Sequence, residues 1–131
     1  MYFLTAEYVI RLNRQFMEGA NEHFAVLFFG TLEGCIEKIQ RILFGVELHP
    51  DIYEKAAALM HCIITRSPFE NGNKRTGMAA ALTFLEMNGI VVDINFAEGV
   101  ELSKRIANSQ VGIAEIANWL RAHTRPFVYR V

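Results

Sequence analysis

The chain has 131 residues, of which 52% are hydrophobic, and its 13 basic and 14 acidic side chains give a formal net charge of −1. This length predicts a single domain, 1–131, with a core that needs neither a metal nor a disulfide to form. The charge balance excludes the basic surface of a general nucleic-acid binder, and the apolar runs are too short to cross a membrane. The first residues lack the features of a secretory signal, so we expect a cytoplasmic location.

Hydrophobic periodicity predicts three helices in the first half of the chain. Residues 5–17 begin with a capping threonine and repeat apolar side chains three and four positions apart. Residues 22–30 are expected to form a loop or irregular apolar segment whose phenylalanines cover the core. A helix is predicted over 31–43, with six apolar residues on one face and Gly45 at its end. Another is expected from the His49-Pro50-Asp51 start signal to about Thr65, apolar on nearly every side.

The second half of the chain shows the same kind of pattern. Residues 73–88 predict a helix that ends at Gly89, and residues 90–94 are β-branched enough to favour one short strand. Two more helices are predicted over 96–108 and 111–121, and the tail 126–131 is interpreted as a β-edge or a docking peptide. The expected fold is all-α, a compact bundle of about six helices with at most one short strand or hairpin.

The cysteines and histidines show no spacing typical of a metal site. Cys35 and Cys62 occupy apolar helical positions and are predicted to be reduced, buried thiols. The four histidines form no paired-ligand array, so a zinc site is not expected, and His61 is predicted to lie in the core. Trp119 is expected to pack against the bundle.

A polar segment, residues 67–77, separates two strongly apolar helices and carries the features of an anion site. Gly72 allows the backbone to approach a ligand closely, and the next helix begins with N–H groups aimed at the turn. Lys74 and Arg75 add positive charge, the arginine with a planar pair of donors suited to phosphate. Asn73 is interpreted as the helix cap.

A purely structural interpretation of this segment stays open. Cations in a first helical turn oppose the helix dipole and need an anion or a carboxylate nearby, and Glu70 is the carboxylate at hand. A Walker A loop fits less well, because Lys74 is followed by arginine rather than serine or threonine and no strand precedes the loop.

The run Phe69-Glu70-Asn71-Gly72-Asn73-Lys74-Arg75-Thr76 resembles the Fic/Doc family signature, in the death-on-curing branch whose motif is His-x-Phe-x-x-Gly-Asn-Lys-Arg-Thr. The flanking alanine-rich helices and the closing segment 115–120 are also similar to this branch, so the resemblance covers nearly the whole chain. It implies a small bundle of about six helices, in agreement with the periodicity.

The resemblance also implies an activity and a set of site residues. Family members transfer AMP or a phosphate from ATP, or another nucleoside triphosphate, to a Ser, Thr or Tyr hydroxyl of a target protein, with a component of the translation machinery as one candidate target. It implies that Asn73 and Arg75 hold phosphates with the Gly72 backbone, that Phe69 anchors the loop, and that position 71 is where a magnesium ligand stands. Lys74, with Met78 in place of a second arginine, is more similar to the phosphate-transferring toxin type.

The chain departs from the family pattern at two positions. Ser67 replaces the histidine that acts as general base, and a hydroxyl accepts a proton only if another base activates it. Asn71 offers magnesium a neutral amide instead of a carboxylate, and the neighbouring Glu70 is expected to point elsewhere. With these two residues the enzyme is therefore expected to be weak or inactive. Ser67 fits a substitution made to produce a toxic protein, a natural loss of chemistry, or the use of a different base.

No inhibitory helix of the kind some family members carry is visible, so the resemblance implies an antitoxin partner that folds as a helix in a groove. Candidate contact surfaces are the phenylalanines at 24, 28 and 29 and the tail 127–129. The alternative to a modifying enzyme is an inactive Fic-like module that binds a nucleotide or a partner. In a third interpretation the domain pairs its cations with Glu70 and binds neither.

Overall fold

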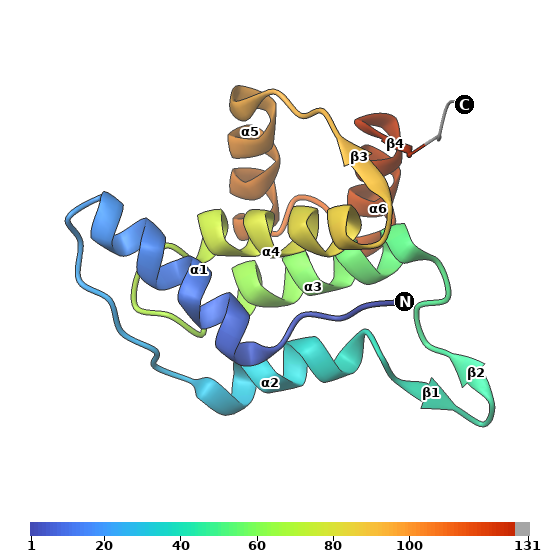
Figure 1. The fold of residues 1–131 in the computed structure, drawn as a ribbon, viewed down its shortest axis with the longest axis horizontal. Helices are drawn as coiled ribbons and strands as arrows, with labels where there is room; N and C mark the ends of the chain where they lie inside the picture. Colours follow the sequence, from blue (N-terminus) through green and yellow to red (C-terminus); the bar gives the residue numbers. More distant parts are fainter. Residues whose placement is uncertain (128–131) are drawn as a thin grey trace.

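Two long helices at the centre of the molecule, α3 (Ile52–Arg66) and α4 (Asn73–Met87), pack along each other and organise the rest of the chain (Figure 1). The computed structural model describes residues 1–127. Around the central pair lie α1 (Ala6–Gly19), α2 (Phe29–Lys38), α5 (Phe96–Ala107) and α6 (Ile113–Ala122). The four short strands are β1 (Ile42–Leu43), β2 (Val46–Glu47), β3 (Ile90–Val92) and β4 (Thr124–Pro126).

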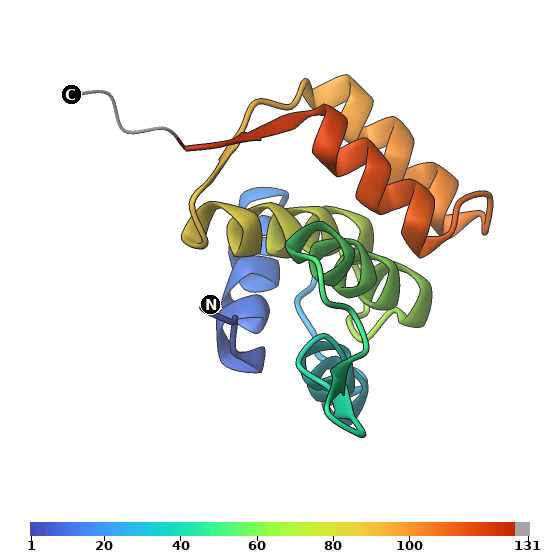
Figure 2. The ribbon, with the colours of Figure 1, turned by 90° about the vertical axis from the view of Figure 1, so that its right-hand side faces the viewer.

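The helices form three layers, which the second view shows most clearly (Figure 2). Helices α5 and α6 both lie above the central pair, while α1 and α2 lie below it. The middle of α3, residues 56–60, is completely buried, which confirms the expectation of a helix surrounded by others. Gly77 lets α4 approach closely, because a Cβ at this position would lie 2.8 Å from Cγ1 of Ile64 on α3. The all-α prediction is therefore confirmed.

The predicted helix over 31–43 is wrong at both ends. It begins at Phe29 and ends at Lys38, and the apolar residues that follow form the antiparallel hairpin β1–β2 instead. Phe44 and Gly45 both have positive φ, as a two-residue hairpin turn requires, so Gly45 sits in a turn and not at a helix end. The apolar period continued past the helix, but the side chains that carried it are exposed at Ile42 and Leu43.

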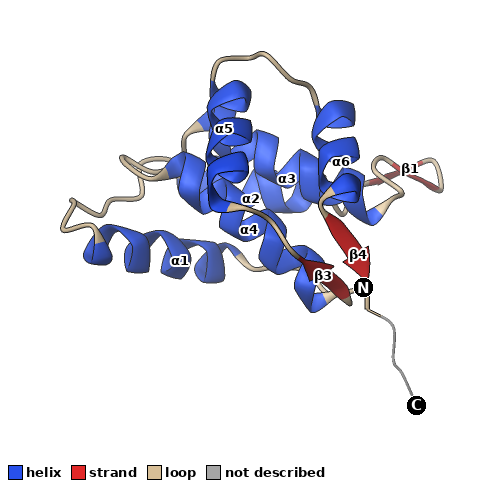
Figure 3. Ribbon diagram, turned by 90° about the horizontal axis from the view of Figure 1, so that it is seen from above, coloured by secondary structure: helices blue, strands red, loops and turns tan. Residues whose placement is uncertain are grey.

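The remaining strand predictions are close to the structure. The short strand is present as β3, and it pairs antiparallel with β4, so the start of the predicted β-edge is confirmed while residues 128–131 lie outside the described part of the chain (Figure 3). Two strand pairs are thus present where at most one strand or hairpin was expected. Phe28 and Phe29 are exposed rather than covering the core. Among residues 1–127, no helix has the length and apolarity needed to cross a bilayer.

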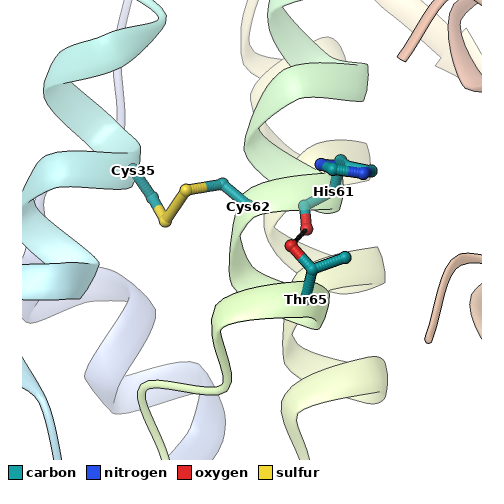
Figure 4. Close-up of a disulfide and its surroundings, with 4 residues drawn as sticks. All are labelled: Cys35, His61, Cys62 and Thr65. Carbon is teal, nitrogen blue, oxygen red and sulfur yellow. Dashed lines mark hydrogen bonds between the residues drawn. A yellow bond between two sulfur atoms is a disulfide. The ribbon is translucent and has the colours of Figure 1, made fainter. Parts of the chain in front are cut away.

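The prediction of two reduced thiols is wrong. Cys35 on α2 and Cys62 on α3 form a disulfide, with their Cα atoms 5.6 Å apart (Figure 4). Both cysteines are buried, as predicted, but burial on facing helices also brings the two sulfur atoms together. A spacing of 27 residues contains no information about this contact.

His61 also differs from its prediction, because its side chain is half-buried rather than in the core and points away from the disulfide (Figure 4). Its backbone oxygen accepts a hydrogen bond from Oγ1 of Thr65 at 2.7 Å. Burial, and to a smaller extent the positive charge of Lys38, lowers the pKa of the His61 imidazole below its usual value of 6.5. Burial likewise lowers the pKa of His49.

Acidification is therefore expected to destabilise the fold. With a folded-state pKa below 6.5, the unfolded chain binds more protons at intermediate pH, so the stability contributed by neutral His61 is present above pH 6.5 and is lost as the pH falls through the lowered value. The melting temperature should drop between about pH 7.5 and about pH 5.5, and it should drop less in a His61→Gln variant. An equal drop in both proteins would show that His61 is not responsible.

Candidate functional site

The loop between α3 and α4, residues 67–72, is held in place by the segment that follows α1. Phe69 is 1% exposed and forms an isolated antiparallel bridge with Val26. The N–H groups of Leu27 and Phe28 donate to the carbonyl of Pro68 at 2.8 and 3.0 Å. The loop is thus fixed by its own core anchor and by backbone pairing with a distant part of the sequence, as the role assigned to Phe69 requires.

Asn73 closes the loop on itself. Its side-chain oxygen accepts from the N–H of Phe69 at 3.0 Å, and its side-chain nitrogen donates to the carbonyl of Phe69 at 2.8 Å. Its interpretation as the helix cap is wrong, because Asn73 is the first residue of α4 and the cap position is Gly72. No side chain caps this helix, so N–H groups of its first turn stay free to bind an anion.

A buried amide on α1 supports the loop from below. Asn13 is fully buried, and its Nδ2 donates to the carbonyl of Asn71 at 2.9 Å and to Oγ1 of Thr76 at 3.0 Å. A Cβ at Gly72 would lie 2.5 Å from Cε of Met17 and 3.1 Å from Nδ2 of Asn13, and the φ of Gly72 is +77°. Glycine at this position is therefore required both by the backbone conformation and by the close approach of α1.

A pocket of about 540 Å³ brings the predicted site residues together. It lies between the end of α3, the start of α4 and the end of α5. Ser67 is exposed at its edge, in the left-handed conformation with φ +50°, and its Oγ donates to the carbonyl of Ile64 at 3.3 Å. The other predicted residues that line the pocket are Glu70, Asn71, Gly72, Asn73, Lys74 and Arg75.

The cations at the start of α4 have no carboxylate partner among residues 1–127. Glu70, which was the candidate, instead makes a hydrogen bond through Oε2 with Nδ1 of His23. The guanidinium of Arg75 lies 4.3 Å from the ring centroid of Phe16 on α1, and Lys74 is exposed. The interpretation in which Glu70 neutralises these two charges is therefore wrong, and both remain available to an anion in the pocket.

The residues of this pocket supply few ligands for a magnesium ion. In the described part of the chain, no three His, Cys, Asp or Glu side chains come together as a metal site. Nδ2 of Asn71 donates to the carbonyl of His23 at 3.2 Å, which leaves its side-chain oxygen as the one possible ligand from this residue. These residues fit magnesium only as an ion whose other ligands are phosphate and water oxygens, the usual state of this metal in nucleotide sites.

Comparison with known proteins agrees with this geometry. The family model described as the Fic/DOC family matches residues 3–85. The chain belongs to the Fic/Doc family. It is 32% identical to Toxin Doc of Mycolicibacterium smegmatis over 91 residues, which are 68% of this chain and 70% of that protein. It is also 28% identical to Protein kinase doc of Escherichia phage P1 over 92 residues, 70% of this chain and 71% of that protein.

Sequence reasoning missed two supports of this Fic/Doc loop, Asn13 and His23. Asn13 had a visible signal, because it falls on the apolar stripe of α1 between Val9 and Met17, where an amide needs a specific partner. His23 had no such signal, since it lies in an irregular segment 47 residues from Glu70.

Proposed function

We propose that this Fic/Doc protein transfers a phosphate or AMP from ATP, or from another nucleoside triphosphate, to a hydroxyl side chain of a target protein, as the toxin of a toxin–antitoxin pair. The observation that carries the proposal is the uncapped start of α4, which faces a pocket together with two cations that no carboxylate of residues 1–127 neutralises. The names of the two relatives, a toxin and a protein kinase, support the same activity. A cytoplasmic site of action is part of this proposal.

The pocket residues suit the binding part of this reaction. The free N–H groups of α4 and the side chains of Lys74 and Arg75 would hold phosphate oxygens, with Arg75 as a two-donor ligand and Lys74 as a point charge. Magnesium, with Asn71 as its ligand from the protein, would offset the negative charge of the phosphates. Asn73 and Phe69 keep the loop in the conformation that exposes these groups.

The chemical step is where this chain is weak. The target hydroxyl oxygen forms a bond to phosphorus while the bond to the leaving group breaks, releasing a nucleoside diphosphate in phosphate transfer or pyrophosphate in AMP transfer. The hydroxyl proton needs an acceptor. The Ser67 hydroxyl is not a strong base, and it donates its proton to the carbonyl of Ile64. The transfer is therefore expected to be slow.

A partner helix has a suitable surface next to the pocket. A groove of about 570 Å³ between α4 and α5 shares Lys74 and Arg75 with the phosphate pocket and has Lys104 at its edge. Its remaining lining is mostly apolar, with Met78, Leu82, Val92, Phe96 and Val100. This groove fits the apolar face of an antitoxin helix that carries acidic residues. It is a different surface from the candidate residues Phe24, Phe28 and Phe29, and of the candidate tail 127–129 the structure describes only Phe127.

The proposal predicts that Arg75→Ala weakens ATP binding about ten- to hundred-fold, because a charge-assisted hydrogen bond contributes roughly 1.5–3 kcal/mol. The affinity is measured by calorimetry with ATP and magnesium. Lys104→Ala is the matched control, since it removes a nearby exposed cation that lies outside the phosphate pocket. Unchanged affinity in Arg75→Ala, with the melting temperature preserved, would exclude Arg75 as a phosphate ligand.

An inactive binding module is the second candidate function, and Ser67 together with Asn71 is the observation that favours it. Such a module would bind ATP through the same pocket without transferring any part of it. Nucleotide binding therefore does not separate the two functions, whereas restoring a base does.

A further inference from the structure

The hairpin β1–β2 projects from the bundle near the start of α3 (Figure 1). Its pairs are Ile42 with Glu47 and Leu43 with Val46, and the N–H of Leu48 donates to the carbonyl of Arg41 at 3.0 Å, which extends the ladder by one pair. Paired residues share a face and successive residues alternate. One face of the hairpin therefore carries Ile42 and Glu47. The other face carries the pairs on either side of them, Leu43 with Val46 and Arg41 with Leu48.

The face with Glu47 is tied to the body of the protein. Oε2 of Glu47 lies 3.2 Å from Nζ of Lys55, which is 4% exposed on α3 and also donates to the carbonyl of His49. These contacts fix the orientation of the hairpin on α3. Ile42, the other residue of this face, is 60% exposed, so Glu47 is the attachment on this side and the hairpin is exposed on both faces.

The opposite face is apolar and uncovered. Leu43, Val46 and Leu48 are 51%, 67% and 41% exposed, and Phe44 at the tip is fully exposed. We call these four residues the hairpin face. Arg41, paired with Leu48, is the charged residue of the hairpin ladder on this side. A two-stranded hairpin alone is marginally stable in water, and contiguous exposed apolar patches commonly mark interaction sites.

We propose that the hairpin face packs against the same face of a second copy of this chain. An interface across a two-fold axis uses the same patch on both subunits, so it needs a patch that complements itself. The hairpin face meets this need, because it is apolar throughout and carries no carboxylate to meet its own copy. Opposing sheet faces of this kind pack through their side chains.

The available area is sufficient for a dimer. With about 150–250 Å² for a large aromatic side chain and somewhat less for an aliphatic one, the exposed parts of the hairpin residues amount to roughly 500–600 Å² per copy. If all of this area were covered, two copies would together bury about 1,000–1,200 Å², which reaches the lower limit for a specific interface. The patch is therefore large enough for a reversible dimer.

The dimer would leave both phosphate pockets open. The hairpin precedes α3 and the loop with Ser67 follows it, so the 15 residues of this helix separate the two regions by about 22 Å at 1.5 Å per residue. Figure 1 shows them at opposite ends of α3. Each copy could bind nucleotide and partner independently, so the inference does not depend on the proposed function.

Light scattering coupled to gel filtration tests the proposal on the full chain over a concentration series. The parent chain is expected to approach twice the mass of 14.9 kDa as its concentration rises. A Leu43→Lys, Val46→Lys double variant is expected to remain a single chain, because it brings like charges together across the axis. Phe96→Lys is the control, since it changes an 82% exposed residue on α5 and should leave the dimer intact.

A parent chain that has the mass of one copy at every concentration would overturn the proposal. Binding to lipid vesicles by such a monomer, lost in the double variant, would assign the hairpin face to a membrane surface instead. A double variant that dimerises like the parent would place the interface elsewhere. Melting curves of both variants show that the proteins compared are folded.

Discussion

The Ser67→His variant is expected to label target protein about 100- to 10,000-fold faster than the parent chain, which is the range that a positioned general base contributes. Ser67 lies at the pocket where the phosphates are expected, and its hydroxyl donates to the carbonyl of Ile64. An imidazole with an unperturbed pKa of about 6.5 accepts a proton at neutral pH, whereas a serine hydroxyl does not. The loop, Asn73 and the two cations are already in place, so under the proposed function the missing base is expected to limit the rate.

The backbone at position 67 accepts histidine without added strain. Its φ is +50°, in the left-handed region where asparagine, aspartate and histidine are enriched among non-glycine residues. Ser67→Asn is therefore the matched control, because asparagine suits the same conformation but is not a base. Both variants are incubated with magnesium, a bacterial lysate and ATP labelled at the α- or the γ-phosphate, and the position of the retained label identifies the transferred group.

The result separates the enzyme from the binding module. Labelling by Ser67→His alone would show that the machinery is intact and lacks only its base. If Ser67→His labels no more protein than Ser67→Asn while both bind ATP, the chain is a nucleotide-binding module and the loss of chemistry extends beyond Ser67.

Periodicity predicted most of the fold because the helices obey local rules. Thr5 and Asp51 cap α1 and α3 through side-chain oxygens, and both were visible as start signals. The pattern failed at residues 42–48, because Ile39 is still buried after the end of α2 whereas the apolar residues of the hairpin are exposed. Their exposure depends on the hairpin turn and on the ion pair of Lys55 with Glu47, and a helical period cannot indicate either.

The candidate site was predictable in its members but not in its contacts. Residues 67–75 are contiguous, so a local motif already places them together. The partners that decide their chemistry come from far away in the sequence. Glu70 contacts His23 instead of the adjacent cations, and Asn71 and Gly72 rest on Asn13 of α1. Asn73 was assigned to the cap because its position suggested it, but the carbonyl and N–H of Phe69 use its whole amide.

The disulfide between Cys35 and Cys62 is expected to contribute about 3.5 kcal/mol to the free energy of unfolding, because closing a loop of this length removes conformational entropy from the unfolded chain. The bridge spans 27 residues and joins α2 to α3, whose far end carries Ser67. Urea unfolding of the oxidised and the fully reduced protein measures the difference. Reduction should lower the unfolding midpoint strongly and leave the native spectrum at low urea unchanged.

A Cys35→Ala, Cys62→Ala double variant is the control for this measurement. It removes the cross-link without burying a hydroxyl, so it should match the reduced protein apart from the loss of two sulfur atoms, and reductant should no longer change its midpoint. Alkylation after unfolding should label both thiols only in the reduced sample, which checks the redox state. If the oxidised and reduced parent chains then have identical midpoints, the packing of α2 on α3 needs no cross-link. A cytoplasmic site of action would expose this bridge to cellular reductants. Reduction would weaken the packing of α2 on α3 in that compartment. It would also weaken the attachment of the segment before α2, which holds the loop.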